Sequence, residues 1–133
     1  MKKIFGLIIL VGLLVAWQYP QEDDQWKNKI TPSLLSELEA GETVDFIIMM
    51  NDQADVSKSR HYHNKLKKGT FVYQKLKDHA KVSQRDVARF LGDRNVPMKS
   101  FFIVNAIYTK GNLELVRTLA MRTDIGEIQA NSK

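Results

Sequence analysis

Hydrophobic side chains dominate two short runs of the chain, and both runs predict strands. The first is 44–50 (VDFIIMM), which a polar turn segment ends, and the second is 101–108 (FFIVNAIY). Both are rich in β-branched and aromatic residues with apolar side chains on both faces, which favours strand over helix. The second run is interrupted only by Asn105-Ala106, a polar and small pair at which one long strand can bend into two.

Between and after these runs the period of the apolar positions becomes helical. Apolar residues recur at three- and four-residue steps over 70–94, which predicts one long amphipathic helix with lysines and arginines on its opposite face. The segment 95–97 (NVP) ends this helix. A second helix is predicted over 112–119 and a last strand over 125–128. The positions that define the long helix are Val72 or Tyr73, Leu76, Ala80, Ser83, Val87, Phe90 and Leu91.

A short extra helix precedes the first strand. Thr31 suits an N-cap, Pro32 suits the first helical position, and Gly41 suits the end of the helix. The segment before it, 18–29, is polar and predicts a linker. The apolar face of this helix consists of Leu34, Leu35 and Leu38.

The predicted elements therefore follow the order α-β-α-β-β-α-β. The last six form βαββαβ, which predicts an α+β, ferredoxin-like fold: a four-stranded antiparallel sheet with two helices on one face, plus the extra N-terminal helix. Two helices cover only one side of such a sheet. Because the strands carry apolar residues on both faces, we expect a partner to pack on the second side.

The first 17 residues read as an export leader. Lys2 and Lys3 precede an apolar run over 4–16, which is short for a bilayer span of about 20 residues. A signal peptide over 1–17 is the favoured interpretation and an uncleaved N-terminal anchor is the alternative. The expected organisation is leader 1–17, linker 18–29 and domain 30–133, in a protein that is secreted or held in the periplasm or cell envelope, with membrane contact only through an uncleaved leader.

Composition excludes several kinds of chemistry. The chain has no cysteine, so disulfides, thiolate metal sites and a thiol nucleophile are impossible. Its formal charge is +5, with an acidic stretch over 21–55 and a basic one over 56–99. We interpret the basic stretch as a solvated helix face rather than a nucleic-acid site, because no RNA- or DNA-binding motif accompanies it.

No residue pattern predicts catalysis, a cofactor or a metal. His61 and His63 have the spacing of two ligands on a strand, but no third ligand is placed to complete a site, and we interpret them as exposed. Acylphosphatases share the predicted architecture and hold phosphate with a glycine-rich loop and an arginine after the first strand. The corresponding loop here, 51–54 (NDQA), has neither, so we expect no enzyme.

Several motifs nevertheless resemble one family. The segments 102–106 (FIVNA), 115–119, Asp124-Ile125 and Ile128 resemble the second half of the propeptide (inhibitor I9) domain of subtilisin-like serine proteases. The first half is similar as well: VDFIIMM resembles its first strand, and NDQADVS at 51–57 resembles an element of one exported bacterial subgroup. The resemblance covers about residues 30–131. The helix residues that match this subgroup are Gly69, Thr70, Phe71, Val72, Tyr73, Leu76, Ala80, Gln84 and Leu91.

The resemblance implies a folding chaperone and inhibitor of a subtilisin-like serine protease, acting in cis or in trans. In that family the exposed sheet face packs on two surface helices of the protease, and the C-terminal tail lies in the substrate cleft. The implied sheet-face residues, with their alternates unresolved, are Phe101, Phe102, Ile103, Val104, Asn105, Ala106, Ile107 and Tyr108, together with the strand 125–128. The implied inhibitory tail is Gln129, Ala130, Asn131, Ser132 and Lys133.

The chain departs from the family pattern near its end. The family often places acidic residues just after the last strand, where they cap helix N-termini of the protease, whereas this sequence has Gln129, Ala130 and Asn131 there. The tail is also short, which favours docking and templating over tight inhibition. The alternative function is an exported ferredoxin-like module that binds a partner other than a protease.

Overall fold

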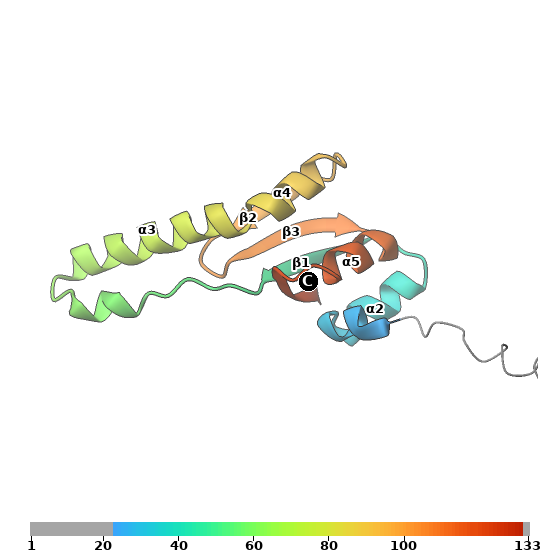
Figure 1. The fold of residues 1–133 in the computed structure, drawn as a ribbon, viewed down its shortest axis with the longest axis horizontal. Helices are drawn as coiled ribbons and strands as arrows, with labels where there is room; N and C mark the ends of the chain where they lie inside the picture. The colour runs from blue at the N-terminus through green and yellow to red at the C-terminus, as the bar shows by residue number, and fades with distance from the viewer. Residues whose placement is uncertain (1–22, 132–133) are drawn as a thin grey trace, which may run out of the picture.

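The computed structural model describes residues 23–131, which form an α+β domain with one four-stranded antiparallel sheet and several helices (Figure 1). The strands are β1 (Val44–Met50), β2 (Met98–Phe101), β3 (Ala106–Gly111) and β4 (Ile125–Ala130). The helices are η2 (Asp24–Lys29), α2 (Pro32–Glu39), η3 (Ser57–His61), α3 (Lys65–Ser83), α4 (Arg85–Gly92) and α5 (Leu113–Ala120). The expected leader, 1–17, lies outside the described residues.

The strands lie in the order β2-β3-β1-β4, and every neighbouring pair is antiparallel. Because β1 and β2 both run opposite to β3, they are parallel to each other with β3 between them. For the same reason β3 and β4 are parallel, with β1 between them. The helices α3 and α4 make the first of these two crossings and α5 makes the second.

One face of this sheet carries the hydrophobic core. Phe46, Ile48 and Met50 from β1 are buried there, and Ile107 and Ile128 join them from β3 and β4. The covering side chains come from η2, α2, α4 and α5 and belong to the same cluster. They are Trp26, Leu34, Leu38, Val87, Leu91, Val116, Leu119 and Ala120.

The short helix before β1 is confirmed, and its cap differs in one detail. Thr31 is the N-cap of α2 and Pro32 its first residue, while Gly41 follows the helix with a φ of 87°, a left-handed conformation that favours glycine. The Thr31 hydroxyl does not cap the helix. It accepts a hydrogen bond from the backbone N–H of Ala130, 3.3 Å away, and so ties α2 to β4.

The segment predicted as a linker enters the fold at its end. Residues 24–29 form η2, and Trp26 in the middle of it is only 8% exposed. Lys29 donates from Nζ to the carbonyl oxygen of Arg122 at 2.7 Å, which fastens η2 beside α5. Next to it, Ile30 forms a single parallel bridge with Ile128 at the edge of β4. Residues 24–29 are polar apart from Trp26, the side chain that anchors η2, so their pattern does not predict a helix.

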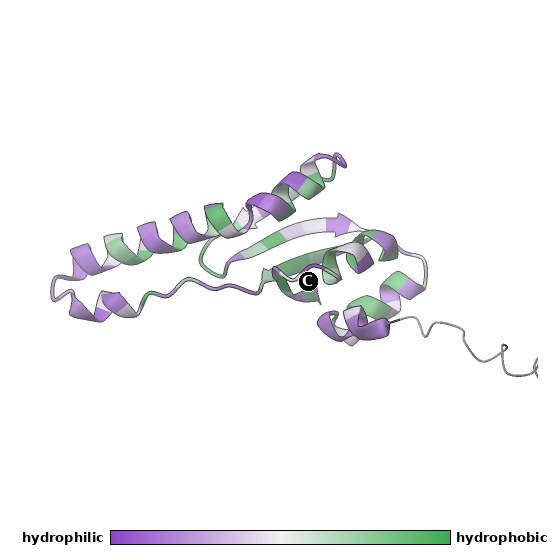
Figure 2. Cartoon of the chain, in the orientation of Figure 1, coloured by the Kyte–Doolittle hydropathy of each residue, from purple (hydrophilic) through white to green (hydrophobic). Residues whose placement is uncertain are grey.

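The prediction of one long helix over 70–94 is wrong. The chain forms two helices, α3 and α4, which meet at Gln84, and α3 begins earlier than predicted, capped by the Asn64 side chain. Only Ala80 of α3 is buried, whereas Val87 and Leu91 of α4 lie in the core. Most of α3 therefore projects beyond the sheet together with η3 (Figures 1 and 2). We call the segment 57–83 the arm.

The second hydrophobic run bends earlier than predicted. The break lies not at Asn105-Ala106 but over 102–105, a turn that joins β2 to β3. The predicted first strand over 44–50 and helix over 112–119 are confirmed, and β4 continues two residues past the predicted 125–128. Asn112 caps α5 by accepting from the Leu115 N–H at 3.1 Å. Among residues 23–131, no helix combines the length and apolar character that crossing a bilayer requires.

Candidate functional site: the open face of the sheet

The strand register assigns each side chain to one of the two faces of the sheet. Directly opposed residues point to the same side, and successive residues alternate. One row across the sheet is Lys99, Tyr108, Ile47 and Gln129, and the next is Phe101, Ala106, Met49 and Glu127. These two rows lie opposite the core face, because Phe46, Ile48 and Ile107 alternate with them. We call this second side the open face.

The centre of the open face is apolar. Ile47, Met49 and Tyr108 are half-buried by their sheet neighbours, and Phe101 at the edge strand is 37% exposed. None of these four side chains belongs to the core cluster or packs against it, although Val44, Met98 and Ala130 on the other face do. The described helices therefore leave this apolar centre without a hydrophobic cover.

Charged side chains frame the apolar centre. Lys99 and Lys110 are exposed on β2 and β3, Glu127 is exposed on β4, and Asp45 lies opposite Lys110. A hydrogen bond with Asp45, burial and the charge of the same carboxylate raise the pKa of Tyr108 above its usual value of 10.0. The phenol is thus held neutral and oriented along the sheet, which leaves its ring to contribute to the apolar surface.

The structure divides the predicted sheet-face residues into three groups. Phe101, Ala106 and Tyr108 lie on the open face, as the register requires, but Ala106 is fully buried there, so only Phe101 and Tyr108 present surface to a partner. Ile107 is fully buried on the core face, so it is not available to a partner. The others are not in a strand at all, because the turn between β2 and β3 contains Phe102, Ile103, Val104 and Asn105.

The turn nevertheless exposes apolar side chains beside the open face. Ile103 is 71% exposed and Val104 is 54% exposed, which is unusual for large apolar residues at a hairpin end. Phe102 turns toward the arm, where its ring meets that of Tyr73 edge-on with centroids 5.5 Å apart. The hairpin thus adds exposed apolar side chains to the domain, and Phe102 joins it to α3.

Asn105 in this turn has a structural position, since it is only 2% exposed. Its side-chain amide donates to the Asp52 carbonyl at 2.6 Å and to the Ser83 hydroxyl at 2.8 Å. Its Oδ1 accepts from Nε2 of Gln84 at 2.9 Å. Asn105 therefore connects the turn, the loop after β1 and the junction between α3 and α4, and its burial keeps it from a partner molecule.

The predicted inhibitory tail begins inside the sheet. Gln129 and Ala130 belong to β4, opposite Ile47 and Phe46, and the Asn131 N–H donates to the Asp45 carbonyl at 3.3 Å. Ser132 and Lys133 lie outside the described residues. Ala130 points to the core side, so Gln129 is the tail residue that the open face presents.

Two open-face residues, Ile47 and Met49, were missed by the sequence analysis of the site. Every position from 46 to 50 is apolar, so the period of two that normally separates the faces of a strand carries no information there. The available signal is that an all-apolar strand must be covered on both sides. The core accounts for Phe46, Ile48 and Met50.

The residues considered for catalysis or metal binding do not assemble. Within residues 23–131, no three histidine, aspartate or glutamate side chains come together as a metal site requires. His61 and His63 are exposed at the tip of the arm, and His79 instead contacts Asp52, with Nε2 3.2 Å from its carbonyl oxygen. The comparisons with known proteins add no assignment: no family model, no curated protein and no solved structure matches the chain.

Proposed function

We propose that this chain is an exported, non-catalytic binding domain that docks a subtilisin-like serine protease on its open face and acts as its folding chaperone, its inhibitor or both. The observation that carries the proposal is the apolar centre of Ile47, Met49, Phe101 and Tyr108, which the described helices leave uncovered. An apolar sheet face rimmed by charges is the kind of surface that a partner protein covers.

The connectivity of the sheet supports the ferredoxin-like part of this proposal. Each crossing connection joins two parallel strands that are separated by one antiparallel strand, which is the arrangement of a split βαβ unit. An element of this kind has one helix-covered face and one free face. The proposed docking surface is the free one.

Two of the residues that carry the family resemblance support it from inside the fold. Gln84 and Asn105 are 21 positions apart in the sequence and hydrogen-bond to each other in the core of the α3–α4 junction. A shared polar contact of this kind is a reason for both residue types to occur together with this topology. The contact gives Gln84 and Asn105 a shared role in the fold, which supports the proposal that the resemblance extends beyond apolar residues.

The engagement of the predicted tail in the sheet favours templating over tight inhibition. Gln129 and Ala130 are paired in β4, so they are not free to lie extended in a protease cleft. An inhibitor of the proposed kind needs an extended segment in that cleft, whereas a chaperone needs the docking face. We therefore expect a larger effect on protease refolding than on the activity of the folded enzyme.

The test is addition of the full chain to subtilisin-like proteases, both folded and refolding from denaturant, with peptide hydrolysis as the readout. The wild type should raise the refolding yield or slow hydrolysis. The pair Phe101→Ala/Tyr108→Ala should lose at least tenfold in potency, since removing two aromatic anchors from an interface costs about 2 kcal/mol or more. Met121→Ala is the control, because Met121 is an exposed apolar side chain that lies off the open face, after α5.

The alternative is an exported module of the same fold with a partner that is not a protease. The open face suits this alternative as well, since an apolar surface does not depend on a protease cleft. Absence of any effect on refolding and hydrolysis across several subtilisin-like proteases would reject the first proposal. If a non-protease is then recovered with the wild type and not with Phe101→Ala/Tyr108→Ala, the alternative holds.

A further inference from the structure

The arm is a second surface that the open face does not use. It leaves the domain after β1, passes through η3 and returns along α3, and it extends well beyond the end of the sheet (Figure 1). All residues from His61 to Thr70 are exposed, and the described part of the chain packs no other element against this end.

The arm has a larger net positive charge than the whole protein. Residues 57–83 contain eight lysines and arginines and one acidic residue, Asp78, which gives 8 − 1 = +7. The whole chain has a formal charge of +5, so the remainder is 5 − 7 = −2. The arm is thus strongly basic on a domain that is otherwise slightly acidic. Its basic residues are Lys58, Arg60, Lys65, Lys67, Lys68, Lys75, Lys77 and Lys81.

Internal ion pairs do not neutralise this charge. Among residues 23–131, none of the eight basic side chains forms a salt bridge with a carboxylate. The pKa of the Asp55 carboxyl, just before η3, is lowered first by hydrogen bonds from Ser57 and last by the charges of Lys75 and Lys58. The one acidic residue of the arm, Asp78, instead accepts a hydrogen bond from Gln74 at 2.9 Å.

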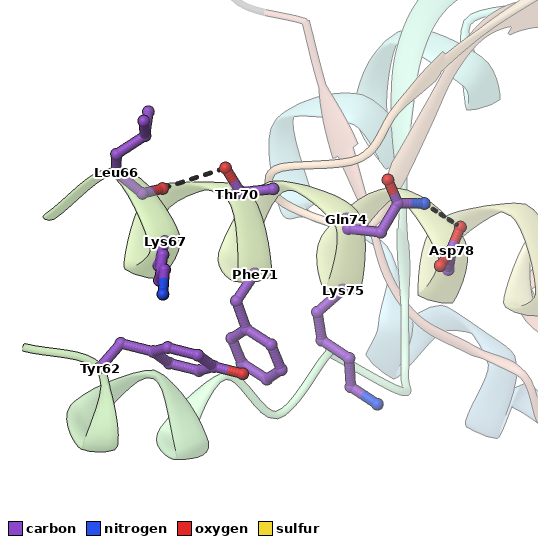
Figure 3. A pocket seen from close by; sticks show the side chains of 8 residues that line it. All are labelled: Tyr62, Leu66, Lys67, Thr70, Phe71, Gln74, Lys75 and Asp78. Carbon is purple, nitrogen blue, oxygen red and sulfur yellow. Dashed lines mark hydrogen bonds between the residues drawn. The ribbon is translucent and has the colours of Figure 1, made fainter. Parts of the chain in front are cut away.

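Apolar side chains accompany the charges at the tip. Leu66, placed between Lys65 and Lys67, is 79% exposed and points away from the rest of the arm (Figure 3). The rings of Tyr62 and Phe71 lie 5.2 Å apart between the end of η3 and α3. Together with Leu66 they form the apolar lining of an open groove of about 600 Å³, which Lys67 and Lys75 also line.

We propose that the tip of the arm docks on an anionic lipid surface, with Leu66 and Tyr62 entering the headgroup region and the surrounding lysines binding lipid phosphates. Exposed apolar residues set among basic ones are the combination that binds membrane interfaces, and each basic residue near an anionic bilayer adds to the attraction. This surface is separate from the open face, so the domain can hold a protein partner and a lipid surface together.

The distribution of the charges favours lipid over the other anionic partners. On α3 the lysines lie on several sides of the helix rather than in one stripe along it, as the spacing of Lys65, Lys67, Lys68, Lys75 and Lys77 requires. A protein interface needs a contiguous buried area of about 800 Å² on each partner, and a few separated apolar side chains do not supply it. A fluid bilayer instead adapts to a narrow tip and offers phosphates on every side of it.

The absence of cysteine allows a site-specific test in the full chain. Leu66→Cys carries an environment-sensitive fluorophore at the tip, and Met121→Cys carries it at an equally exposed position on the domain body. Each is mixed with vesicles of phosphatidylglycerol and phosphatidylcholine, or of phosphatidylcholine alone. The label at 66 should shift to the blue on phosphatidylglycerol vesicles only, and the label at 121 on neither. Because the probe is local, binding through the N-terminal segment does not imitate this result.

The charge contribution is tested in the same labelled chain. Lys67→Gln/Lys68→Gln should raise the lipid concentration that gives half of the shift by about thirtyfold, as expected for two basic residues near an anionic surface. Lys99→Gln/Lys110→Gln removes the same charge from the open face and should change this concentration by no more than about twofold. The proposal would be overturned by equal shifts of the labels at 66 and 121, or by an equal shift of the label at 66 on neutral vesicles. Full reversal of the shift by poly-glutamate or DNA at matched charge would also overturn it, in favour of a soluble polyanion or an acidic protein as the partner.

Discussion

Gln84 and Asn105 satisfy each other and their neighbours in a closed polar network beneath the turn. Nε2 of Gln84 donates to Oδ1 of Asn105 and to the Phe101 carbonyl, both at 2.9 Å, and its Oε1 accepts from the Ser100 hydroxyl at 2.5 Å. Both N–H donors of the Asn105 side chain are used as well. Within the described residues, no buried side-chain nitrogen or oxygen lacks a partner. The network fixes where α3 ends, where β2 ends and where the loop after β1 passes.

Asn105→Ala should lower the free energy of unfolding by about 2–4 kcal/mol, because it removes the acceptor of one Gln84 amide hydrogen and the donors to the Asp52 carbonyl and the Ser83 hydroxyl. Chemical denaturation measures this change. Gln84→Ala should be comparably costly, and the double variant should cost less than the sum, with a coupling of about 1–3 kcal/mol. Strict additivity of the two changes would show that the network is not cooperative.

Ile107 and Tyr108 are adjacent in β3 but serve opposite faces. Ile107→Ala should lower the free energy of unfolding by about 2–5 kcal/mol, because it empties a fully buried position of the core. Tyr108→Ala should cost less in stability and more in partner binding, since the ring lies on the open face. Denaturation curves and the refolding assay, run on both variants, separate these effects. A larger loss of stability for Tyr108→Ala would mean that the face assignment is reversed.

The contact between Tyr108 and Asp45 predicts a dependence of stability on alkaline pH. The fold raises the pKa of Tyr108, so the folded state holds the phenol proton more tightly than the unfolded chain does. The stabilisation is therefore complete below the unfolded value of about 10 and is lost as the pH rises through the raised folded value. In Asp45→Ala this loss should be smaller, and NMR titration of the Tyr108 ring should move toward the ordinary value.

Asp78→Ala is the matched control for that experiment. It removes the same side chain from the arm, where the carboxylate accepts only from Gln74, and should leave the alkaline limb of the stability curve unchanged. An identical alkaline limb in the wild type and in Asp45→Ala would exclude Asp45 as the cause of the raised pKa.

The arm should open more readily than the sheet. In α3 only Ala80, near its end, is buried, while β1 is paired on both sides. Local unfolding needs little free energy where few apolar contacts are lost. Amide hydrogen exchange over 65–72 should therefore be at least a hundredfold faster than over 46–50. Tyr62→Ala should accelerate exchange in this part of α3 further, because the Tyr62–Phe71 contact is what joins η3 to it. Uniform protection of α3 and β1 would contradict this.

Local rules were sufficient for part of the fold. The Thr31-Pro32 start and Gly41 end of α2 and the strand over 44–50 follow from side-chain geometry that acts over a few residues. The predictions of one long helix over 70–94 and of a bend at Asn105-Ala106 were both wrong, and for the same reason. Gln84 and Asn105 are polar residues in apolar patterns, and only their contact across 21 positions shows that one ends a helix and the other ends a turn.

The sequence by itself determined that the protein is an α+β domain with strands too apolar for a single core, because composition and period are properties of short segments. Only the tertiary structure decided which alternate residues meet the core, since both sets are apolar and the register of β1, β2, β3 and β4 alone distinguishes Ile107 from Tyr108. It also decided that the basic half of the expected long helix leaves the sheet. A lysine-rich helix has no local reason to end at Ser83, and the buried network at Gln84 supplies a nonlocal one.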